Sequence, residues 1–251
     1  AAPHRRPAGE PQTGRIVEIE QFLWGASAEG EGILLYTLRC ADGREVRLSN
    51  AGAAVTGIYV PRPAGMPEAL TPVFETPEAL LSDYADCGKT LCGNLYGFGR
   101  RIWESRVETN RVVMELPAGD DGSPAMAVLF DLDDDGQFAV THLARGATAM
   151  PFTMTTQLFW HGDWQPTIRT KERTTASDGD FLPIDGWHKN ILGEAARLEN
   201  PATNRIVEIL TSQPEARILR HGDTVAVLCG ESRPAPLDEE SAYCHKTVYR
   251  F

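Results

Sequence analysis

The sequence feature that most constrains the fold is a succession of short apolar or alternating segments separated by residues that favour turns. The segments read RIVEIEQFLW, GILLYTLRC, EVRLSN, AVTGIYV, RVVMEL, MAVLFDL, QFAVTHL, TMTTQLFW, RIVEIL, ARILRH, TVAVLCG and KTVYRF. Gly, Pro, Asn and Asp clusters such as CADGRE, PAGDDGSP and DLDDDGQ lie between them and indicate turns. Short strands with turns at roughly 8 to 12 residues are typical of β-sandwiches. We therefore predict an all-β fold, a large antiparallel β-sandwich with few short helices.

Two segments carry helical signals instead. TPEALLSDYADCG has Thr76 in position to cap a helix, Pro77 at the first helical position and Gly88 beyond its end. NILGEAARLE is a weaker helical candidate, because Gly193 interrupts it. The sequence therefore predicts one clear helix and a second, less regular one.

The length and the cysteine pattern bound the organisation of the chain. All-β sandwiches often use roughly 200 to 250 residues as one domain, so we expect a single domain over 15–251 of the 251 residues. The first fourteen residues, rich in Pro, Gly and Arg, are expected to be frayed. The five cysteines are scattered and form no Cys-x-x-Cys pair, which favours free thiols in a reducing, cytoplasmic compartment.

The charge and the motifs narrow the class of partner. A formal net charge of -11 argues against a nucleic-acid partner, because phosphate backbones are bound by clustered Lys and Arg. No apolar run approaches the roughly 20 residues that cross a bilayer, so we expect no membrane partner. The six histidines lack metal-binding spacing, and no nucleotide-binding loop is complete, so we expect neither a metal nor a cofactor. A small-molecule ligand and a monomer or homodimer are the expectation.

The stretch PFTMTTQLFWHGDW, at 151–164, predicts a strand with two different faces. Apolar residues fall on even positions, namely Phe152, Met154, Leu158 and Trp160, and Phe159 is the one apolar residue on an odd position. Polar residues fall on odd ones, namely Thr153, Thr155, Gln157 and His161. Because successive side chains on a strand point to opposite faces, one face belongs to the core and the other carries hydrogen-bonding groups.

Four segments, in this order, resemble the aldose 1-epimerase (galactose mutarotase) family. LYTLRCADGREVRLSNAGAAVTGIYVPR is similar to the paired strands that open this family, and YGFGRRI, at 96–102, is similar to a segment with a sugar-binding arginine. PFTMTTQLFW is similar to the strand that carries the catalytic acid, and VAVLCGESRPAP to the segment that holds the catalytic base. The resemblance extends over most of the chain from about residue 30.

This resemblance implies a galactose mutarotase-like supersandwich and an isomerase that interconverts sugar anomers without a cofactor. The catalytic base falls on Glu231 and the orienting arginine on Arg101, with Arg100 beside it where the family has Asn. Gln157 and Phe159, on the strand of the catalytic acid, are expected to contact the substrate. Mutarotation needs a base for the anomeric hydroxyl and an acid for the ring oxygen.

The sequence departs from the family at the acid. The family histidine is replaced by Gln157, and an amide cannot donate a proton at pH 7. His161 lies on the same face of the strand but about 13 Å further along. His188, in GWHKNIL, stands where the family has an Asp, and the short link ESRVETN leaves no room for the family's second active-site histidine. We therefore take His161 or His188 as a displaced acid.

Two alternative functions stay open at this point. A protein that kept the cleft and lost the acid would bind carbohydrate without catalysis. An enzyme with one carboxylate base and an amide donor at Gln157 would suffice for the isomerisation or cyclisation of a non-sugar intermediate.

Overall fold

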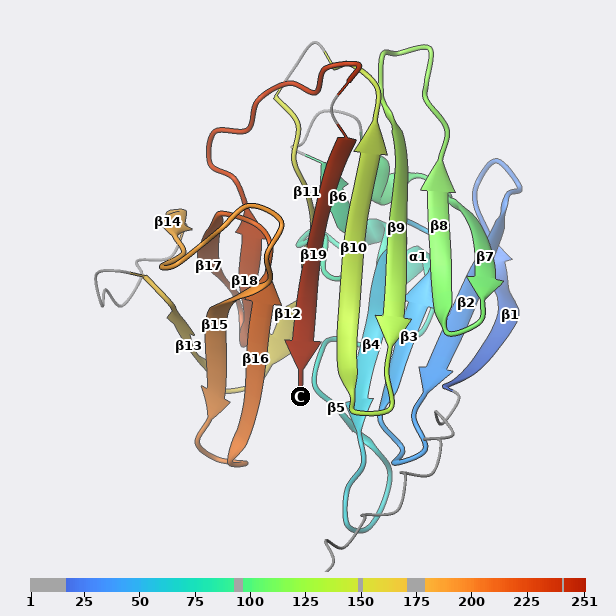
Figure 1. Cartoon of the computed structure of the whole chain (residues 1–251). Helices are drawn as coiled ribbons and strands as arrows, with labels where there is room; N and C mark the ends of the chain where they lie inside the picture. The colour runs from blue at the N-terminus through green and yellow to red at the C-terminus, as the bar shows by residue number, and fades with distance from the viewer. Residues whose placement is uncertain (1–16, 93–96, 149–150, 171–178, 241) are drawn as a thin grey trace, which may run out of the picture.

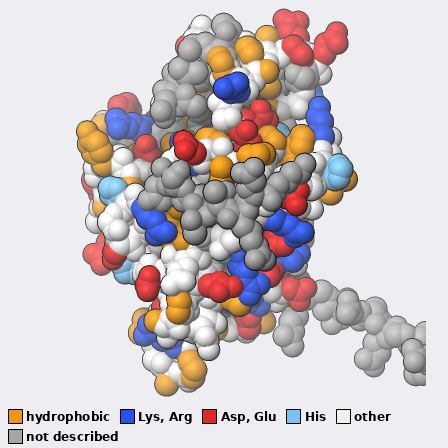
Figure 2. Space-filling view, turned by 90° about the vertical axis from the view of Figure 1, so that its left-hand side faces the viewer, with side chains coloured by type: hydrophobic (Ala, Val, Ile, Leu, Met, Phe, Trp, Pro, Cys, Tyr) orange, Lys and Arg blue, Asp and Glu red, His pale blue; other side chains and the backbone are white. Residues whose placement is uncertain are grey.

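The computed structural model describes residues 17–92, 97–148, 151–170, 179–240 and 242–251. Its regular structure is antiparallel β-sheet with one short α-helix and one 3-10 turn, which confirms the predicted all-β class (Figure 1). Within these residues no helix is long and apolar enough to cross a membrane. On the face in Figure 2, acidic and basic side chains are interspersed.

The first sheet is five-stranded and follows the chain in simple order. Its strands are β1 (Glu18–Ala26), β2 (Gly32–Arg39), β3 (Glu45–Ser49), β4 (Ala54–Val60) and β5 (Glu68–Ala69). The predicted segments RIVEIEQFLW, GILLYTLRC, EVRLSN and AVTGIYV form β1 to β4, which are joined by short turns, whereas β5 lies outside the predicted segments. The sheet lies behind β8, β9 and β10 in Figure 1.

The second sheet is eight-stranded, in the order β13-β15-β16-β19-β10-β9-β8-β7. Its strands are β7 (Glu104–Glu108), β8 (Arg111–Leu116), β9 (Ala125–Leu132), β10 (Gln137–Arg145), β13 (Gln165–Ile168), β15 (Gly193–Asn200), β16 (Arg205–Thr211) and β19 (Ala242–Arg250). The DLDDDG motif forms the turn between β9 and β10, with Gly136 in the left-handed region at a φ of 75°. The last strand of the chain therefore lies in the middle of this sheet.

Two smaller sheets complete the fold. One pairs β11 (Met154–Thr156) with β6 (Thr90–Cys92), and the other has the order β12-β18-β17-β14. The strands of the latter are β12 (Phe159–His161), β14 (Leu182–Pro183), β17 (Glu215–His221) and β18 (Thr224–Gly230). β18 is buried along its length after its first residue, so it delivers the residue that follows it to a fixed place.

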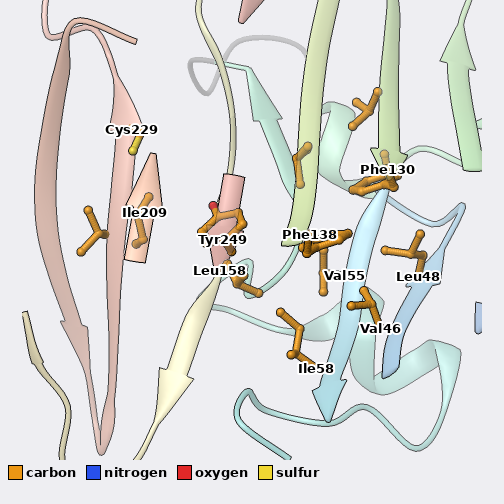
Figure 3. Packing of buried hydrophobic residues seen from close by; sticks show 14 of the residues in the cluster. Val46, Leu48, Val55, Ile58, Phe130, Phe138, Leu158, Ile209, Cys229 and Tyr249 are labelled. Atoms are coloured by element: carbon orange, nitrogen blue, oxygen red, sulfur yellow. The ribbon is translucent and has the colours of Figure 1, made fainter. Parts of the chain in front are cut away.

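One apolar cluster fills the space between the sheets. Figure 3 shows Val55 and Ile58 of the first sheet beside Phe138 of the second. Phe138 is fully buried, and its ring stacks on Phe130 and on Tyr249 at centroid distances of 6.2 Å each. Such stacking adds to the gain from apolar burial, so these rings join β9, β10 and β19 to the core.

The predicted helix is present but shorter than expected. Helix α1 covers Pro77–Ser82, and the Thr76 hydroxyl accepts a hydrogen bond from the Ala79 amide at 3.2 Å, which confirms the cap. The prediction of the helix end at Gly88 is wrong. The chain leaves the helix at Asp83, whose carboxylate accepts from the Cys87 amide and so stabilises a turn instead.

The second helical prediction, over NILGEAARLE, is also wrong. Most of this segment forms β15, which pairs with β13 and β16. Ala195, Ala196 and Leu198 are buried there, and the local helical preference of these residues yields to sheet pairing.

The two-faced strand at 151–164 is confirmed on its apolar side and broken in the middle. Phe152, Met154, Leu158 and Trp160 are all buried. β11 pairs with β6, whereas β12 pairs with β18, so the chain changes partner sheets between Thr156 and Phe159. At the break, the Gln157 amide donates to the Lys89 carbonyl at 3.1 Å and its carbonyl accepts from the Gly88 amide.

Candidate active site

A cleft of about 890 Å³ opens beside the end of β18 and the start of β19. Its polar lining comes from four separate parts of the chain and includes Lys189, Ser212, Glu231, His245 and Lys246. Apolar residues complete its walls, among them Phe152, Leu192, Pro236 and Leu237. A pocket with a few converging polar groups and apolar walls is the usual form of a small-molecule site.

Glu231 is the carboxylate that β18 places at this cleft. It follows Gly230 directly and is half-buried. Burial raises the pKa of Glu231 above its ordinary value, and the neighbouring Glu215 carboxylate raises it further. Glu215 pairs with Gly230 across the ladder and accepts a hydrogen bond from the Ser232 amide. A carboxyl whose pKa is moved toward neutrality is suited to proton transfer.

His188 lies on the same side of the molecule as Glu231. It lines a cleft with Pro214 and Glu215, and these two residues also line a smaller cleft with Glu231. Lys189, its neighbour in sequence, reaches the larger cleft. The structure therefore brings two of the residues predicted from the sequence, Glu231 and His188, around one Pro214–Glu215 corner.

Tyr243 forms the buried wall of the large cleft. Its hydroxyl accepts from the Gln213 side-chain amide at 2.7 Å and from the Met154 backbone amide at 2.9 Å, and donates to the Met154 carbonyl at 3.0 Å. Thr153 also contacts this hydroxyl, at 3.3 Å. Burial raises the pKa of Tyr243 to about 12, so the phenol stays neutral and acts as a fixed support.

His245 stands on the same face of β19 as Tyr243. The two rings pack edge to face with centroids 4.8 Å apart. Its Nδ1 lies 3.2 Å from the Ser212 carbonyl oxygen and 3.3 Å from the Ser212 hydroxyl. Burial lowers the pKa of His245 and the positive charge of Lys189 lowers it further, while the bond to Ser212 opposes this shift.

Arg100 and Arg101 do not line the cleft that contains Glu231. Both are exposed at the end of the 3-10 turn η1 (Phe98–Arg100). The guanidinium of Arg101 lies over the Phe98 ring at 6.0 Å. Hydrogen bonds from Ser123 lower the pKa of Asp121, and nearby Arg101 lowers it further. The neighbouring 93–96 segment, which includes Tyr96 of the YGFGRRI motif, lies outside the described residues.

Gln157 and Phe159 are engaged within the protein. The side-chain amide of Gln157 donates to the Ala85 carbonyl, so this donor is already used where the chain changes sheets. Phe159 is only 3% exposed and packs with Cys87 and Ala226. The expected substrate contact of Phe159 is inconsistent with this burial, because its ring has almost no surface left to offer a ligand.

His161 lies at the opposite end of β18 from Glu231. It pairs with Thr224, the first residue of β18, and Glu231 follows seven residues later. At about 3.3 Å per residue this separates the two positions by roughly 23 Å. His161 is exposed, and its Nδ1 lies 3.3 Å from a carboxylate oxygen of Asp223. One sugar ring cannot contact both residues, so His161 does not fit the acid that partners Glu231.

No protein-family model matches this chain, and no curated protein matches its sequence significantly. Solved structures do match in three dimensions. Galactose 1-epimerase from Lactobacillus acidophilus NCFM is 12% identical over 93% of this chain and 98% of its own, with a TM-score of 0.72. An aldose epimerase homologue from C. elegans is 15% identical over 83% of this chain and 95% of its own, with a TM-score of 0.69. The chain has the galactose mutarotase-like fold.

Within the galactose mutarotase-like fold, sequence reasoning missed the cluster on β19. The segment KTVYRF predicts only the end of the last strand, whereas β19 begins at Ala242. The alternation continues through AYCHKTVYRF, which puts Tyr243, His245, Thr247 and Tyr249 on one face. Extending this pattern upstream would have placed His245 on the inner face of a strand that follows closely after Glu231.

Proposed function

We propose that this protein is an aldose 1-epimerase-like isomerase that interconverts the anomers of a sugar or of a sugar-like cyclic hemiacetal. The observation that carries the proposal is Glu231, a half-buried carboxyl in an open cleft of a galactose mutarotase-like fold. Burial and Glu215 raise the pKa of this carboxyl, which brings it closer to that of an effective base at neutral pH.

In the proposed reaction Glu231 takes the proton from the anomeric hydroxyl. The electron pair left on that oxygen forms the carbonyl, the bond from C1 to the ring oxygen breaks, and an acid protonates the ring oxygen. The C1–C2 bond then rotates, and the ring closes on the other face with the two proton transfers reversed. The reaction is balanced with two proton-transfer groups and needs no redox partner.

The chemistry of the cleft fits a polyhydroxylated ring. The Ser212 hydroxyl and the Lys189 and Lys246 ammonium groups supply donors around Glu231. Phe152 and Leu192 supply apolar surface for the CH faces of such a ring. Among the described residues no group of three His, Cys, Asp or Glu side chains is arranged to hold a metal ion.

The direct test is NMR exchange between anomers for a panel of aldoses at anomeric equilibrium. Wild type should speed the exchange, and Glu231→Gln should lower the rate by about 10²-fold or more. Glu215→Gln is the matched control, because it removes the neighbouring charge and keeps the base. This control should stay active, with the rising limb of its pH profile moved to lower pH, since Glu215 helps to raise the pKa of Glu231.

Other outcomes of this experiment would replace the proposal. Chemical-shift changes with a sugar but no faster exchange would indicate a carbohydrate-binding protein without mutarotase activity. Neither binding nor exchange across the panel would point to a non-sugar substrate.

A further inference from the structure

We propose that His245 is the second proton-transfer residue of this site and replaces the histidine that the chain lacks at Gln157. The inference rests on the proposed function, because it assigns the acid that mutarotation requires. It identifies β19 as the source of that acid, in place of the strand that includes Gln157. The residue was not among those predicted from the sequence.

His245 and Glu231 line the same cleft. Thr153 connects the two sides: its Oγ1 lies 3.3 Å from the Tyr243 hydroxyl. A Cβ placed on Gly230, next to Glu231, would lie 3.9 Å from Thr153 Oγ1. The ring of Tyr243 packs against the ring of His245, with their centroids 4.8 Å apart. Glu231 thus lies toward the hydroxyl end of Tyr243, and His245 packs on its ring.

The contacts of His245 with Ser212 fix which ring nitrogen is protonated. A carbonyl oxygen can only accept, so the 3.2 Å contact between Nδ1 and the Ser212 carbonyl assigns the proton to Nδ1. The Ser212 hydroxyl, 3.3 Å from the same nitrogen, is thereby left to accept as well. This arrangement directs proton exchange to Nε2, the nitrogen that a ligand can use.

Titratable groups surround His245 on four segments, one of which is β10, where His142 stands directly opposite. Burial lowers the pKa of His245, and Lys189, on the loop before β15, lowers it further. Lys246 is on β19 itself, while Glu231 and Asp238 line the cleft from the segment after β18. The acid is the imidazolium, which gives its Nε2 proton readily to the ring oxygen because its pKa is lowered, and the neutral ring takes that proton back when the sugar ring closes.

His142 and His188 fit the role of the acid less well than His245 does. His142 lies directly opposite His245 on β10, but it is buried and its Nε2 is 3.0 Å from the Thr156 hydroxyl. His188 lines the adjoining cleft with Glu215, whereas the large cleft has Glu231 and His245 in its lining. The matched control is His221, which is exposed and pairs with Thr224 at the end of β18 opposite to Glu231.

The experiment compares His245→Gln with His221→Gln in the NMR exchange assay, using an aldose that wild type converts. His245→Gln should lower the maximal rate by about 10²-fold to 10⁴-fold with a smaller change in KM, and His221→Gln should stay close to wild type. The falling limb of the pH profile, where the acid loses its proton, should disappear in His245→Gln. Added imidazole should restore exchange to His245→Ala, which a purely structural role would not allow.

Different results would overturn the proposed mutarotase activity and the assignment of His245. An inactive wild type would overturn the proposed function. Wild type that is active and depends on Glu231, together with His245→Gln at the wild-type rate and with both pH limbs, would overturn the assignment of His245 alone. Circular dichroism of each variant separates loss of catalysis from loss of fold, and the imidazole rescue decides the case if His245→Gln unfolds.

Discussion

Tyr243 shows how one residue fixes the wall of the candidate site. Its hydroxyl accepts from Gln213 and Met154 and donates to the Met154 carbonyl, all within the buried interior. We expect Tyr243→Phe to lower the free energy of unfolding by about 1–3 kcal/mol, because it leaves buried donors unpaired. Urea unfolding measures this, and Tyr249→Phe, whose ring packs in the core, is the comparison. A loss no larger than that of the comparison would show that the network contributes little.

The raised pKa of Glu231 suits proton transfer but lowers the stability of the fold at neutral pH. Its pKa is raised in the folded protein, so its contribution favours folding at low pH and is lost as the pH rises through the folded pKa. At pH 7 the ionised carboxylate is therefore destabilising, and Glu231→Gln should stabilise the protein by up to about 1 kcal/mol after solvent screening. Thermal unfolding at pH 7 and pH 4 checks this. A gain that does not shrink at pH 4 would contradict the assigned cause.

His142 predicts the acid sensitivity of the fold. Burial, with the nearby His245, lowers the pKa of His142 to about 3, whereas an unfolded histidine titrates near 6.5. Stability linked to this group is full above about pH 6.5 and is lost as the pH falls toward 3. The loss is at most about 1.4 kcal/mol per pH unit. The slope of unfolding free energy against pH should become shallower in His142→Gln, which keeps a partner for Thr156, and should stay unchanged in exposed His221→Gln.

Among the elements, β18 sets the geometry of the candidate site. Its pairing register with β12 puts His161 and Glu231 at opposite ends, a fact that the separate motifs in the sequence do not contain. The residues TVAVLCG predicted the strand over its full length, because apolar residues run through it without a break. Which strand it pairs with, and therefore which histidine it meets, depends on contacts far apart in the chain. This is why Glu231 was predicted with its place in the cleft, and His245 was not.

Local signals failed where long-range contacts take over. The Thr76 cap was predicted correctly because it involves residues only three positions apart. In the sequence Gly88 indicates a helix end, but in the structure its carbonyl accepts a hydrogen bond from the Val55 amide of β4 at 2.9 Å. Its positive φ of 75° serves this contact between distant segments, and nothing in the local sequence distinguishes it from a helix-terminating glycine.

This contact gives a prediction for the element that carries it. A Cβ on Gly88 would lie 1.9 Å from the Val55 carbonyl oxygen, so Gly88→Ala forces the backbone apart as well as straining φ. We expect Gly88→Ala to cost more than about 3 kcal/mol in unfolding free energy, or to prevent folding. Gly193→Ala in β15 is the control, since its Cβ meets nothing within 4 Å, and should change stability by less than about 1 kcal/mol. Equal effects in the two variants would refute the steric argument.

At the scale of the whole molecule, one apolar cluster includes residues from the five-stranded sheet, the eight-stranded sheet and the sheet of β18. Trp103, near the first sheet, and Trp160, on β12, both belong to it and are almost fully buried. Because close-packed side chains transmit the loss of any contact, the sheets should unfold together rather than one after another.

Phe138 tests this cooperativity, because it stacks on Phe130 on one side and on Tyr249 on the other. Phe138→Ala should cost about 3–5 kcal/mol. Its denaturation midpoint should move by the same amount whether far-UV circular dichroism reports all strands or tryptophan fluorescence reports the surroundings of Trp103 and Trp160. The chain has three further tryptophans, Trp24, Trp164 and Trp187, so the signal of Trp103 or of Trp160 is measured as the fluorescence that is lost in the Trp103→Phe or the Trp160→Phe background. If one tryptophan changes at a lower denaturant concentration than the other, the sheets form separate folding units and the prediction of a single domain over 15–251 fails.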